Sequence, residues 1–451
     1  MNPIPALELA AIMEAVPVCL TAAALITGFA TDSREVKPGD LFLAIAGARV
    51  DGHDFAERAI EMGATAVLAE REVPVPHLRV ENLVEALAKM GRHFRSRFEG
   101  PVVGITGSAG KTSTKEFVAA ALSPLGEVVK TPGNRNTEFT APLLWAEVDA
   151  EVKAVVVEMS MRGFGQVAHL ASFSQPTVGI VTNIGTAHIE LVGSREGIAR
   201  AKGELIEALP PSGLAVLNGD DDYNGFLAGL ARCEVATFGT RSADALLVEY
   251  RAEDWTHSAA RYEVDGRQVS ARLPAVGRHM ALNAASALLV ASRLGIDLDS
   301  AARALESADL PPMRMQAIPW QGATIVMDAY NASPASMHVA LETLGSVPCQ
   351  GRRLAVLGEM KELGDFSEAE HRAVGERVAR SGLDEVCFYG APMSFAMAEA
   401  KARGFSSVRM ADSLEDVAAF LRELQPGDTV LVKGSRGLEL EGALALLGVK
   451  A

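Results

Sequence analysis

Residues 102–117 constrain the fold more than any other segment, because an apolar strand runs into a glycine-rich turn and then into a helix. Gly107 and Gly110 allow the backbone to turn tightly and to aim its N–H groups inward. The helix N-terminus adds partial positive charge, Lys111 can reach nucleotide phosphates, and the Thr112 hydroxyl can ligate Mg²⁺. The segment therefore predicts a phosphate-binding loop between a strand and a helix.

This loop departs from the strict G-x-x-x-x-G-K-[ST] pattern. Ile105 stands where the first glycine is expected, and Gly104 lies one position too early. An exposed Gly/Ser turn is the alternative, since motifs of this length also occur by chance. The apolar segments on both sides of the loop favour phosphate binding.

Length and charge limit the remaining possibilities. At about 100 to 200 residues per domain, a chain of 451 residues is expected to form two to four domains, and we expect three. The formal net charge of -15 argues against a nucleic-acid-binding surface. No apolar run approaches the roughly 20 residues of a membrane span, and the N-terminus lacks the basic start of a signal peptide. We expect a cytoplasmic monomer.

The four cysteines are scattered without C-x-x-C spacing. This arrangement indicates neither a zinc site nor a disulfide framework. Cys19, Cys233, Cys349 and Cys387 are therefore expected to be small core residues.

Alternating patterns predict an α/β fold. The first region ends in a helix that carries apolar residues on one face from Leu83 to Phe98, and Glu99-Gly100-Pro101 breaks that helix. Apolar segments then alternate with helical ones, which is typical of a mainly parallel sheet. The expected strands are 102–106, 154–158, 178–183 and 214–217, and the expected helices are 112–125 and 195–208.

Two later features complete the predicted architecture. Asp265-Gly266 between two β-rich segments predicts a hairpin. Strands expected at 324–328, 354–357, 385–389 and 429–432 follow Pro311-Pro312, and each precedes a helix or a Gly-rich loop, which favours a second doubly wound domain. The predicted domains are 1–99 (N-terminal α/β), 100–312 (central, ATP-binding) and 313–451 (C-terminal, Rossmann-like).

Polar residues follow several of these strands, where parallel sheets bind ligands. Glu158 ends an apolar strand and can hold Mg²⁺, although an acidic strand end can also be simply solvated. His188 follows the strand that ends near Asn183, and it can ligate a second metal or play a structural part. Lys202 lies on a charged helix, where lysine is normally solvated.

Two stretches of the third region also follow strands, residues 327–334 and 433–437. Both lie where open α/β sheets bind nucleotides or substrates, although the second can be merely a basic turn. Together with the loop they imply a cleft that closes to keep water from an activated phosphate.

Taken together, these residues resemble the Mur ligases, the ATP-dependent amide-forming enzymes of peptidoglycan (cell wall) precursor synthesis. The resemblance covers all three regions in order and implies three domains, the first of which holds a uridine-diphosphate substrate. It rests on residues 106–112, Glu158-Met159, Thr182 to Gly185 with Ala187-His188, Ala201 to Glu204, Gly277 to Asn283, and Arg314-Met315.

The resemblance implies particular roles for individual residues. Lys111, Glu158, His188 and Lys202 are expected to be catalytic, and Thr112, Glu158, His188 and a carbamylated Lys202 are expected to bind Mg²⁺. ATP contacts are expected from Thr106, Gly107, Ser108, Ala109, Gly110, Lys111, Thr112, Ser113, Asn283, Arg314, Asp328 and Asn331. Ser33, Arg34, His53, Asn134 and Asn136 are expected to bind the UDP-linked substrate, and Ser435 the incoming amine.

Within the family, residues 330–337 and 357–364 resemble the ligase that joins D-alanyl-D-alanine to UDP-N-acetylmuramoyl-tripeptide. The Asp-Asn-Pro-Arg motif of the diamino-acid ligase is absent from the sequence. The implied reaction passes through an acyl phosphate, which turns a substrate carboxylate into an electrophile. Residues 131–136 resemble a glycine-asparagine loop of the family, and directly after it Thr137 and Glu138 stand where another asparagine and a small apolar residue are common.

Other functions remain open at this point. A different Mur-type ligase or a folylpolyglutamate-synthase-like ligase shares the ATPase region, although the latter does not need Asp32-Ser33-Arg34 and Asp51-Gly52-His53. A P-loop kinase or NTPase transfers or releases phosphate without forming an amide. An inactive nucleotide-binding module binds without turnover.

Overall fold

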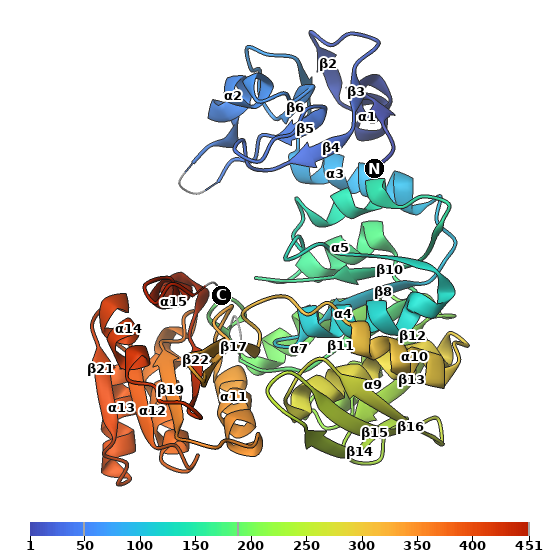
Figure 1. Ribbon diagram of the computed structural model, residues 1–451. Helices are drawn as coiled ribbons and strands as arrows, with labels where there is room; N and C mark the ends of the chain where they lie inside the picture. Colours follow the sequence, from blue (N-terminus) through green and yellow to red (C-terminus); the bar gives the residue numbers. More distant parts are fainter. Residues whose placement is uncertain (48–49, 187–188, 450–451) are drawn as a thin grey trace. The chain divides into compact units, whose positions relative to one another are not determined.

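The computed structural model describes residues 1–47, 50–186 and 189–449, and most of its strands pair in parallel (Figure 1). The predicted α/β fold class is thus confirmed. The chain divides into two compact units. The first comprises residues 1–104, 126–161 and 165–177, and the second comprises residues 105–125, 162–164 and 178–451. The predicted domain boundaries after residues 99 and 312 stay predictions.

The first unit begins with a small sheet in the strand order β2-β7-β6-β5-β4. Strands β4 to β7 pair in parallel, and β2 joins β7 in antiparallel fashion. Ala56 and Ala59 of α2 lie in one apolar core with Phe42 and Val67 of the sheet. The elements are β1 (Ile4–Pro5), α1 (Ala6–Met13), β2 (Val16–Val18), β3 (Leu25–Ile26), β4 (Gly28–Ala30), β5 (Asp40–Leu43), α2 (Ala56–Glu61), β6 (Ala66–Ala69), β7 (His77–Arg79) and α3 (Leu83–Arg95).

A second part of the first unit contains parallel strands and a short helix. These elements are β9 (Glu127–Lys130), β10 (Val152–Glu158) and α5 (Gln166–Ser174), with a 3₁₀ segment at Ala141–Glu147. Strand β8 (Val102–Thr106) carries the chain from the first unit into the second.

Arg95, the last residue of α3, joins the two parts of the first unit. Its buried guanidinium donates to the carbonyls of Ser174, Gln175 and Phe98 at 2.9, 3.1 and 2.6 Å. It also lies 5.5 Å from the centroid of the Trp145 ring. Because these carbonyls include two at the C-terminal end of α5, the cation also meets the negative end of the helix dipole.

We expect Arg95→Ala to destabilise the protein by about 3 kcal/mol, because it leaves three carbonyls without their donor and opens a cavity. The matched control is Arg97→Ala, an exposed arginine two residues along, which should change the free energy of unfolding by less than about 0.5 kcal/mol. Denaturant titration of both variants measures the difference. Equal stability of the two variants would contradict this account of Arg95.

The second unit contains a sheet in which β11 to β14 run in parallel, followed by antiparallel β15 and β16. Asp265 and Gly266 both have left-handed backbones, with φ of 49° and 77°, and they form the predicted hairpin turn. The strands are β11 (Val178–Val181), β12 (Leu214–Asn218), β13 (Glu234–Gly239), β14 (Ala245–Ala252), β15 (Ser258–Val264) and β16 (Arg267–Leu273). The helices are α4 (Lys111–Leu122), α6 (Ile189–Val192), α7 (Arg195–Glu207), α8 (Asn224–Leu230), α9 (Arg278–Arg293) and α10 (Leu298–Ala304).

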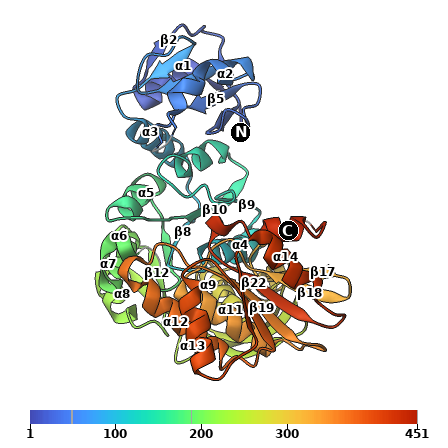
Figure 2. The same ribbon diagram turned by 90° about the vertical axis from the view of Figure 1, so that its left-hand side faces the viewer.

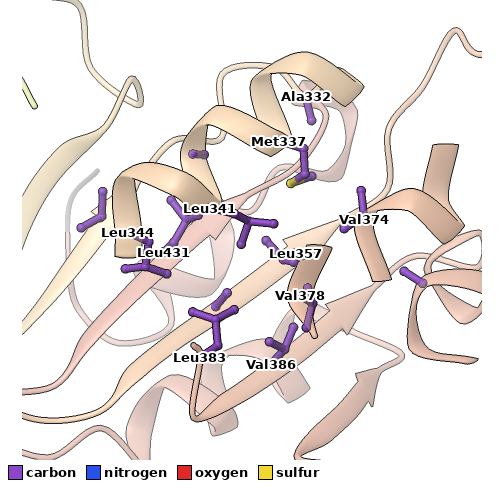
Figure 3. Packing of buried hydrophobic residues seen from close by; sticks show 14 of the residues in the cluster. Ala332, Met337, Leu341, Leu344, Leu357, Val374, Val378, Leu383, Val386 and Leu431 are labelled. Carbon is purple, nitrogen blue, oxygen red and sulfur yellow. The ribbon is translucent and has the colours of Figure 1, made fainter. Parts of the chain in front are cut away.

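The C-terminal part of the second unit is doubly wound, as predicted, and its sheet has the strand order β17-β18-β22-β19-β20-β21. Figure 2 labels strands β17, β18, β19 and β22 of this sheet. Helices α11 to α13 cover one face, and α14 and α15 cover the other. Figure 3 shows Leu341 and Leu344 of α11, and Val374 and Val378 of α12, packing on the strands. The elements are β17 (Gln316–Trp320), β18 (Ala323–Met327), α11 (Pro334–Ser346), β19 (Arg353–Gly358), α12 (Ser367–Val378), β20 (Glu385–Tyr389), α13 (Met393–Ala402), β21 (Val408–Ala411), α14 (Leu414–Arg422), β22 (Thr429–Lys433) and α15 (Glu441–Ala445).

The cysteines differ from expectation. Cys387 is buried, but Cys233 and Cys349 are only partly buried and Cys19 is exposed. The prediction of a core position is therefore wrong for Cys19, which lies in a left-handed turn after β2 with φ of 53°.

Candidate active site

The predicted phosphate-binding loop joins β8 to α4, as the sequence indicates. Gly107 and Gly110 have φ of 149° and 83°, conformations that favour glycine. A Cβ atom on Gly107 would lie 1.8 Å from the Thr182 hydroxyl oxygen. The Lys111 ammonium donates to the Gly107 carbonyl at 2.9 Å. The loop is therefore tight, and it keeps its lysine folded over its own backbone.

The end of the neighbouring strand β11 holds the loop in place. Thr182 donates from its hydroxyl to the Ala109 carbonyl at 2.6 Å. The Asn183 side chain pairs with both backbone groups of Ala109, accepting from the N–H and donating to the carbonyl at 3.0 Å each. The Ser108 hydroxyl accepts from the Gly185 N–H at 2.9 Å. These bonds fix the shape of the loop before any ligand binds.

We expect Gly107→Ala to weaken ATP binding at least about tenfold, because the new methyl group must displace Thr182 or distort the loop. Gly225→Ala in α8 is the control, since its Cβ would meet no atom within 4 Å. Calorimetric titration with ATP measures both variants. Native affinity in the Gly107 variant would show that this loop does not hold the phosphates.

Lys202 lies on α7 and is almost fully buried, at 1% exposed. Burial, and secondly the charge of Lys111, lower the pKa of its amine well below the ordinary value for lysine. The prediction that a lysine on this charged helix is normally solvated is therefore wrong for Lys202. Its helix turns it inward beside Ala201 and Gly203, which are also buried. A neutral lysine amine is a nucleophile, which a solvated ammonium is not.

Two expected ATP contacts lie close to the loop. The amide of Asn283 on α9 lies about 3 Å from the position of a Cβ on Gly110. Arg314 donates to the Thr112 hydroxyl at 2.9 Å, and its guanidinium lies 4.1 Å from the centroid of the Tyr330 ring. The structure thus brings both residues to the loop from distant parts of the chain.

The remaining expected ATP contacts lie at the end of β18. Asp328 forms an ion pair with the buried Lys433, with an Oδ2 to Nζ distance of 2.7 Å. The same ammonium donates to the Asn331 carbonyl at 3.1 Å. Asp328 also accepts from the Met315 N–H at 3.3 Å. Asp328 and Asn331 therefore share one cation, Lys433, which begins the predicted 433–437 stretch but had no role of its own among the sequence-based expectations.

Ser435 follows β22 at the same edge of the C-terminal sheet. Its side chain is buried, and its hydroxyl accepts from the Lys361 N–H at 2.9 Å. The residue therefore joins the loop after β19 to the loop after β22.

Glu158 ends β10 in the first unit, as predicted, and its side chain is buried rather than solvated. Asn136 donates from its side chain to the carboxylate at 2.8 Å. The Glu158 N–H donates to the Thr131 hydroxyl at 2.9 Å, and Asn134 accepts from the Asn136 N–H at 2.8 Å. Thr131 and Asn136 of the 131–136 loop thus contact Glu158, the first at its backbone N–H and the second at its carboxylate.

The expected UDP-substrate residues near the N-terminus lie in two turns. Arg34 is exposed and pairs with Asp32, which lowers the pKa of that carboxyl to about 2, while Ser33 is buried. His53 is buried, accepting from the Glu70 N–H at 3.0 Å and lying 2.6 Å from Asp51. Both ring nitrogens of His53 are thus engaged within the domain, where they position the turn.

His188 lies outside the described residues. Thr182 and Asn183 follow the apolar strand β11, and Lys433 is the last residue of the apolar strand β22, but none of the three was selected as a site residue. That position was a usable signal for all three.

Comparison with known proteins identifies the class. The family model for the Mur ligase middle domain matches residues 105–291, that for the Mur ligase glutamate ligase domain matches residues 313–436, and that for the Mur ligase family catalytic domain matches residues 25–95. The chain belongs to the Mur ligase family. It is therefore an ATP-dependent ligase that forms carbon–nitrogen bonds.

Individual relatives and solved structures show which Mur ligases the chain is similar to. The chain is 37% identical to the UDP-N-acetylmuramoyl-tripeptide–D-alanyl-D-alanine ligase of Synechocystis sp., over 94% of this chain and 92% of the relative. Its structure is similar to MurF from Acinetobacter baumannii, with a TM-score of 0.89, 29% identity and 99% of each chain covered. It is also similar to MurF ligase from Thermotoga maritima in complex with ADP, with a TM-score of 0.80 and 34% identity, and the match covers 93% of this chain and 96% of that one.

None of the helices formed by residues 1–47, 50–186 and 189–449 has the length and apolar character of a membrane span.

Proposed function

We propose that this chain joins D-alanyl-D-alanine to UDP-N-acetylmuramoyl-tripeptide in peptidoglycan precursor synthesis, as a cytoplasmic monomer. The proposal rests on the loop at residues 107–112, whose hydrogen bonds hold it in shape for binding phosphate. This loop lies in a chain that is similar to a UDP-N-acetylmuramoyl-tripeptide–D-alanyl-D-alanine ligase over more than nine-tenths of its length. ATP phosphorylates the terminal carboxylate of the tripeptide. The amine of the dipeptide then attacks the acyl carbon and displaces phosphate.

The main difficulty of this reaction is negative charge. A carboxylate must approach a polyphosphate, and the protein itself carries a formal net charge of -15. Cations and N–H groups at the site must therefore stabilise the transferring phosphoryl group. We propose that Lys111, Arg314 and the backbone N–H groups of residues 107–112 do this, and that Asn283, Asp328 and Asn331 bind the rest of ATP.

The residues available fit Mg²⁺. Mg²⁺ is usually held by one or two carboxylates together with substrate phosphates and water, rather than by an all-protein cage. Within the described ranges, no group of three His, Cys, Asp or Glu side chains is placed to hold a metal. We propose that the Thr112 hydroxyl of the second unit is a ligand of Mg²⁺, that the Glu158 carboxylate of the first unit is also a ligand of Mg²⁺, and that His188 is a ligand of a second ion. Bound Mg²⁺ neutralises charge on the phosphates.

We further propose that Lys202 carries a carbamate. Its amine attacks CO₂, loses a proton, and becomes an anion that can serve as an oxygen ligand for the second ion. The inward position of Lys202 and the lowered pKa of its amine support this proposal, since only the neutral amine reacts.

Carbon-13 NMR of the enzyme in ¹³C-bicarbonate tests the carbamate. Native protein should give a carbamate carbonyl signal that Lys202→Gln lacks, and the variant should lose at least about 100-fold in kcat. An active native enzyme without that signal would rule the modification out.

In the first unit, we propose that Ser33, Arg34 and His53 serve the uridine diphosphate end of the substrate. Arg34 is exposed and can turn from Asp32 to a phosphate, whereas His53 acts by holding its turn. Asn134 and Asn136 are proposed to serve the same substrate beside Glu158.

A substrate panel tests the proposed function. Phosphate release from ATP should require UDP-N-acetylmuramoyl-tripeptide and D-alanyl-D-alanine together, and an amide product should form in equal amount. Turnover with free meso-diaminopimelate or glutamate would assign the chain to another ligase. Phosphate release without amide would favour a kinase or NTPase, and ATP binding without turnover would indicate an inactive module.

Lys111→Ala should lower kcat by about 100-fold or more while leaving the affinity for the UDP-linked substrate within about twofold of native. Calorimetry with that substrate and a phosphate-release assay measure the two effects. Lys401→Ala, an exposed lysine on α13, is the control and should behave as native. Loss of UDP-substrate binding in the Lys111 variant would point to a folding defect instead.

A further inference from the structure

His371 is a buried histidine that the reaction described above does not use. It has no solvent exposure and lies on α12, on the same side as Val374 and Val378, which pack on the sheet in Figure 3. Its Nδ1 lies 2.6 Å from the Ser367 carbonyl, and its Nε2 lies 3.1 Å from the Met360 nitrogen. The ring therefore bridges the first turn of α12 and the loop that follows β19.

The two partners fix the protonation of this ring. The Met360 N–H can only donate, so Nε2 must carry the lone pair, and the proton lies on Nδ1 toward the Ser367 carbonyl. Burial lowers the pKa of His371, against the opposing effects of the Ser367 carbonyl and the Glu359 carboxylate. The neutral ring is thus the form that the fold selects.

Neighbouring N–H groups of the same loop are fixed as well. The Glu359 N–H donates to the Tyr389 carbonyl at 3.0 Å, and the Lys361 N–H donates to the Ser435 hydroxyl at 2.9 Å. The Ser435 N–H returns a bond to the Glu359 carbonyl at 3.1 Å. The three consecutive N–H groups of residues 359–361 thus each have an acceptor, and His371 supplies the one for Met360. Residues 359–361 therefore form a rigid edge beside Ser435.

This edge presents two opposite charges. The Glu359 carboxylate and the Lys361 ammonium lie 3.8 Å apart, with side chains 19% and 51% exposed. Gly437 leaves room for the ammonium, because a Cβ there would lie 2.8 Å from Lys361 Nζ. A carboxylate and an ammonium next to a hydroxyl suit a small zwitterion, which carries one charge of each sign.

We propose that His371 is a positioning residue for the incoming dipeptide: by accepting the Met360 N–H, it holds the Glu359–Lys361 edge beside Ser435, where the charged ends of the dipeptide bind. This inference rests on the proposed function. His371 itself touches neither ATP nor the dipeptide.

Steady-state kinetics of the full-length His371→Ala and His371→Gln variants test the inference, with KM measured separately for each of the three substrates. His371→Ala should raise KM for D-alanyl-D-alanine about tenfold, since a buried N–H loses its acceptor, and should change KM for ATP and for the UDP-linked tripeptide less than about twofold. Glutamine carries both an acceptor and a donor, so His371→Gln should recover part of the loss.

His338→Ala is the matched control. His338 lies on the adjacent helix α11 of the same domain, and its Nδ1 accepts no hydrogen bond from the described residues. All three KM values should stay native in this variant. Thermal unfolding of every variant separates a change in the loop from a loss of folded protein. If His371→Ala does not fold, the change in KM for D-alanyl-D-alanine in His371→Gln decides.

Two results overturn the inference. One is an equal rise in all three KM values, and the other is native kinetics in folded His371 variants that only melt at lower temperature. Native enzyme that shows no turnover with D-alanyl-D-alanine refutes the proposed function, and the inference with it. Active native enzyme with unaffected His371 variants refutes the inference alone.

Discussion

The close approach of Gly107 to Thr182 determines the shape of the proposed nucleotide site. With a Cβ-to-hydroxyl separation of only 1.8 Å available, no other residue fits at position 107. The same contact lets Thr182 and Asn183 hold Ala109 at three points, so the loop keeps its shape without phosphate. A preformed loop loses less conformational entropy on binding than a flexible one. The alternating strands and helices of the second unit serve to bring these two strand ends together.

Positive charge gathers at the proposed ATP site, although the chain as a whole is negatively charged. The formal net charge is -15, yet Lys111, Lys202, Arg314 and Lys433 are all placed at or beside the proposed ATP contacts. Lys433 is neutralised by Asp328, and Arg314 stacks on Tyr330, so each cation has a defined position. Burial, and secondly the charge of Lys111, lower the pKa of the Lys202 amine. One set of electrostatic interactions thus supports both the proposed phosphate binding and the proposed carbamate.

The fold and the loop could be predicted because short-range signals determine them. Most elements of the second unit could be predicted within a few residues from apolar strands, helix periodicity and the Asp265-Gly266 turn. The edge strands β17 and β21 were not predicted, because half-exposed strands lack a continuous apolar run. The inward position of Lys202 and the pairing of Asp328 with Lys433 depend on contacts between distant segments. No local pattern encodes such contacts. His371 is of the same kind, since its partner at Met360 lies in another loop.

In the proposed reaction, the γ-phosphoryl group of ATP passes to a substrate carboxylate rather than to water. Oxygen-18 placed in the terminal carboxylate of UDP-N-acetylmuramoyl-tripeptide tests this directly, because collapse of an acyl phosphate leaves one carboxylate oxygen on the phosphate. Mass spectrometry of the released phosphate should find one labelled oxygen per amide formed. Released phosphate without the label, at a time when amide accumulates, would contradict the account.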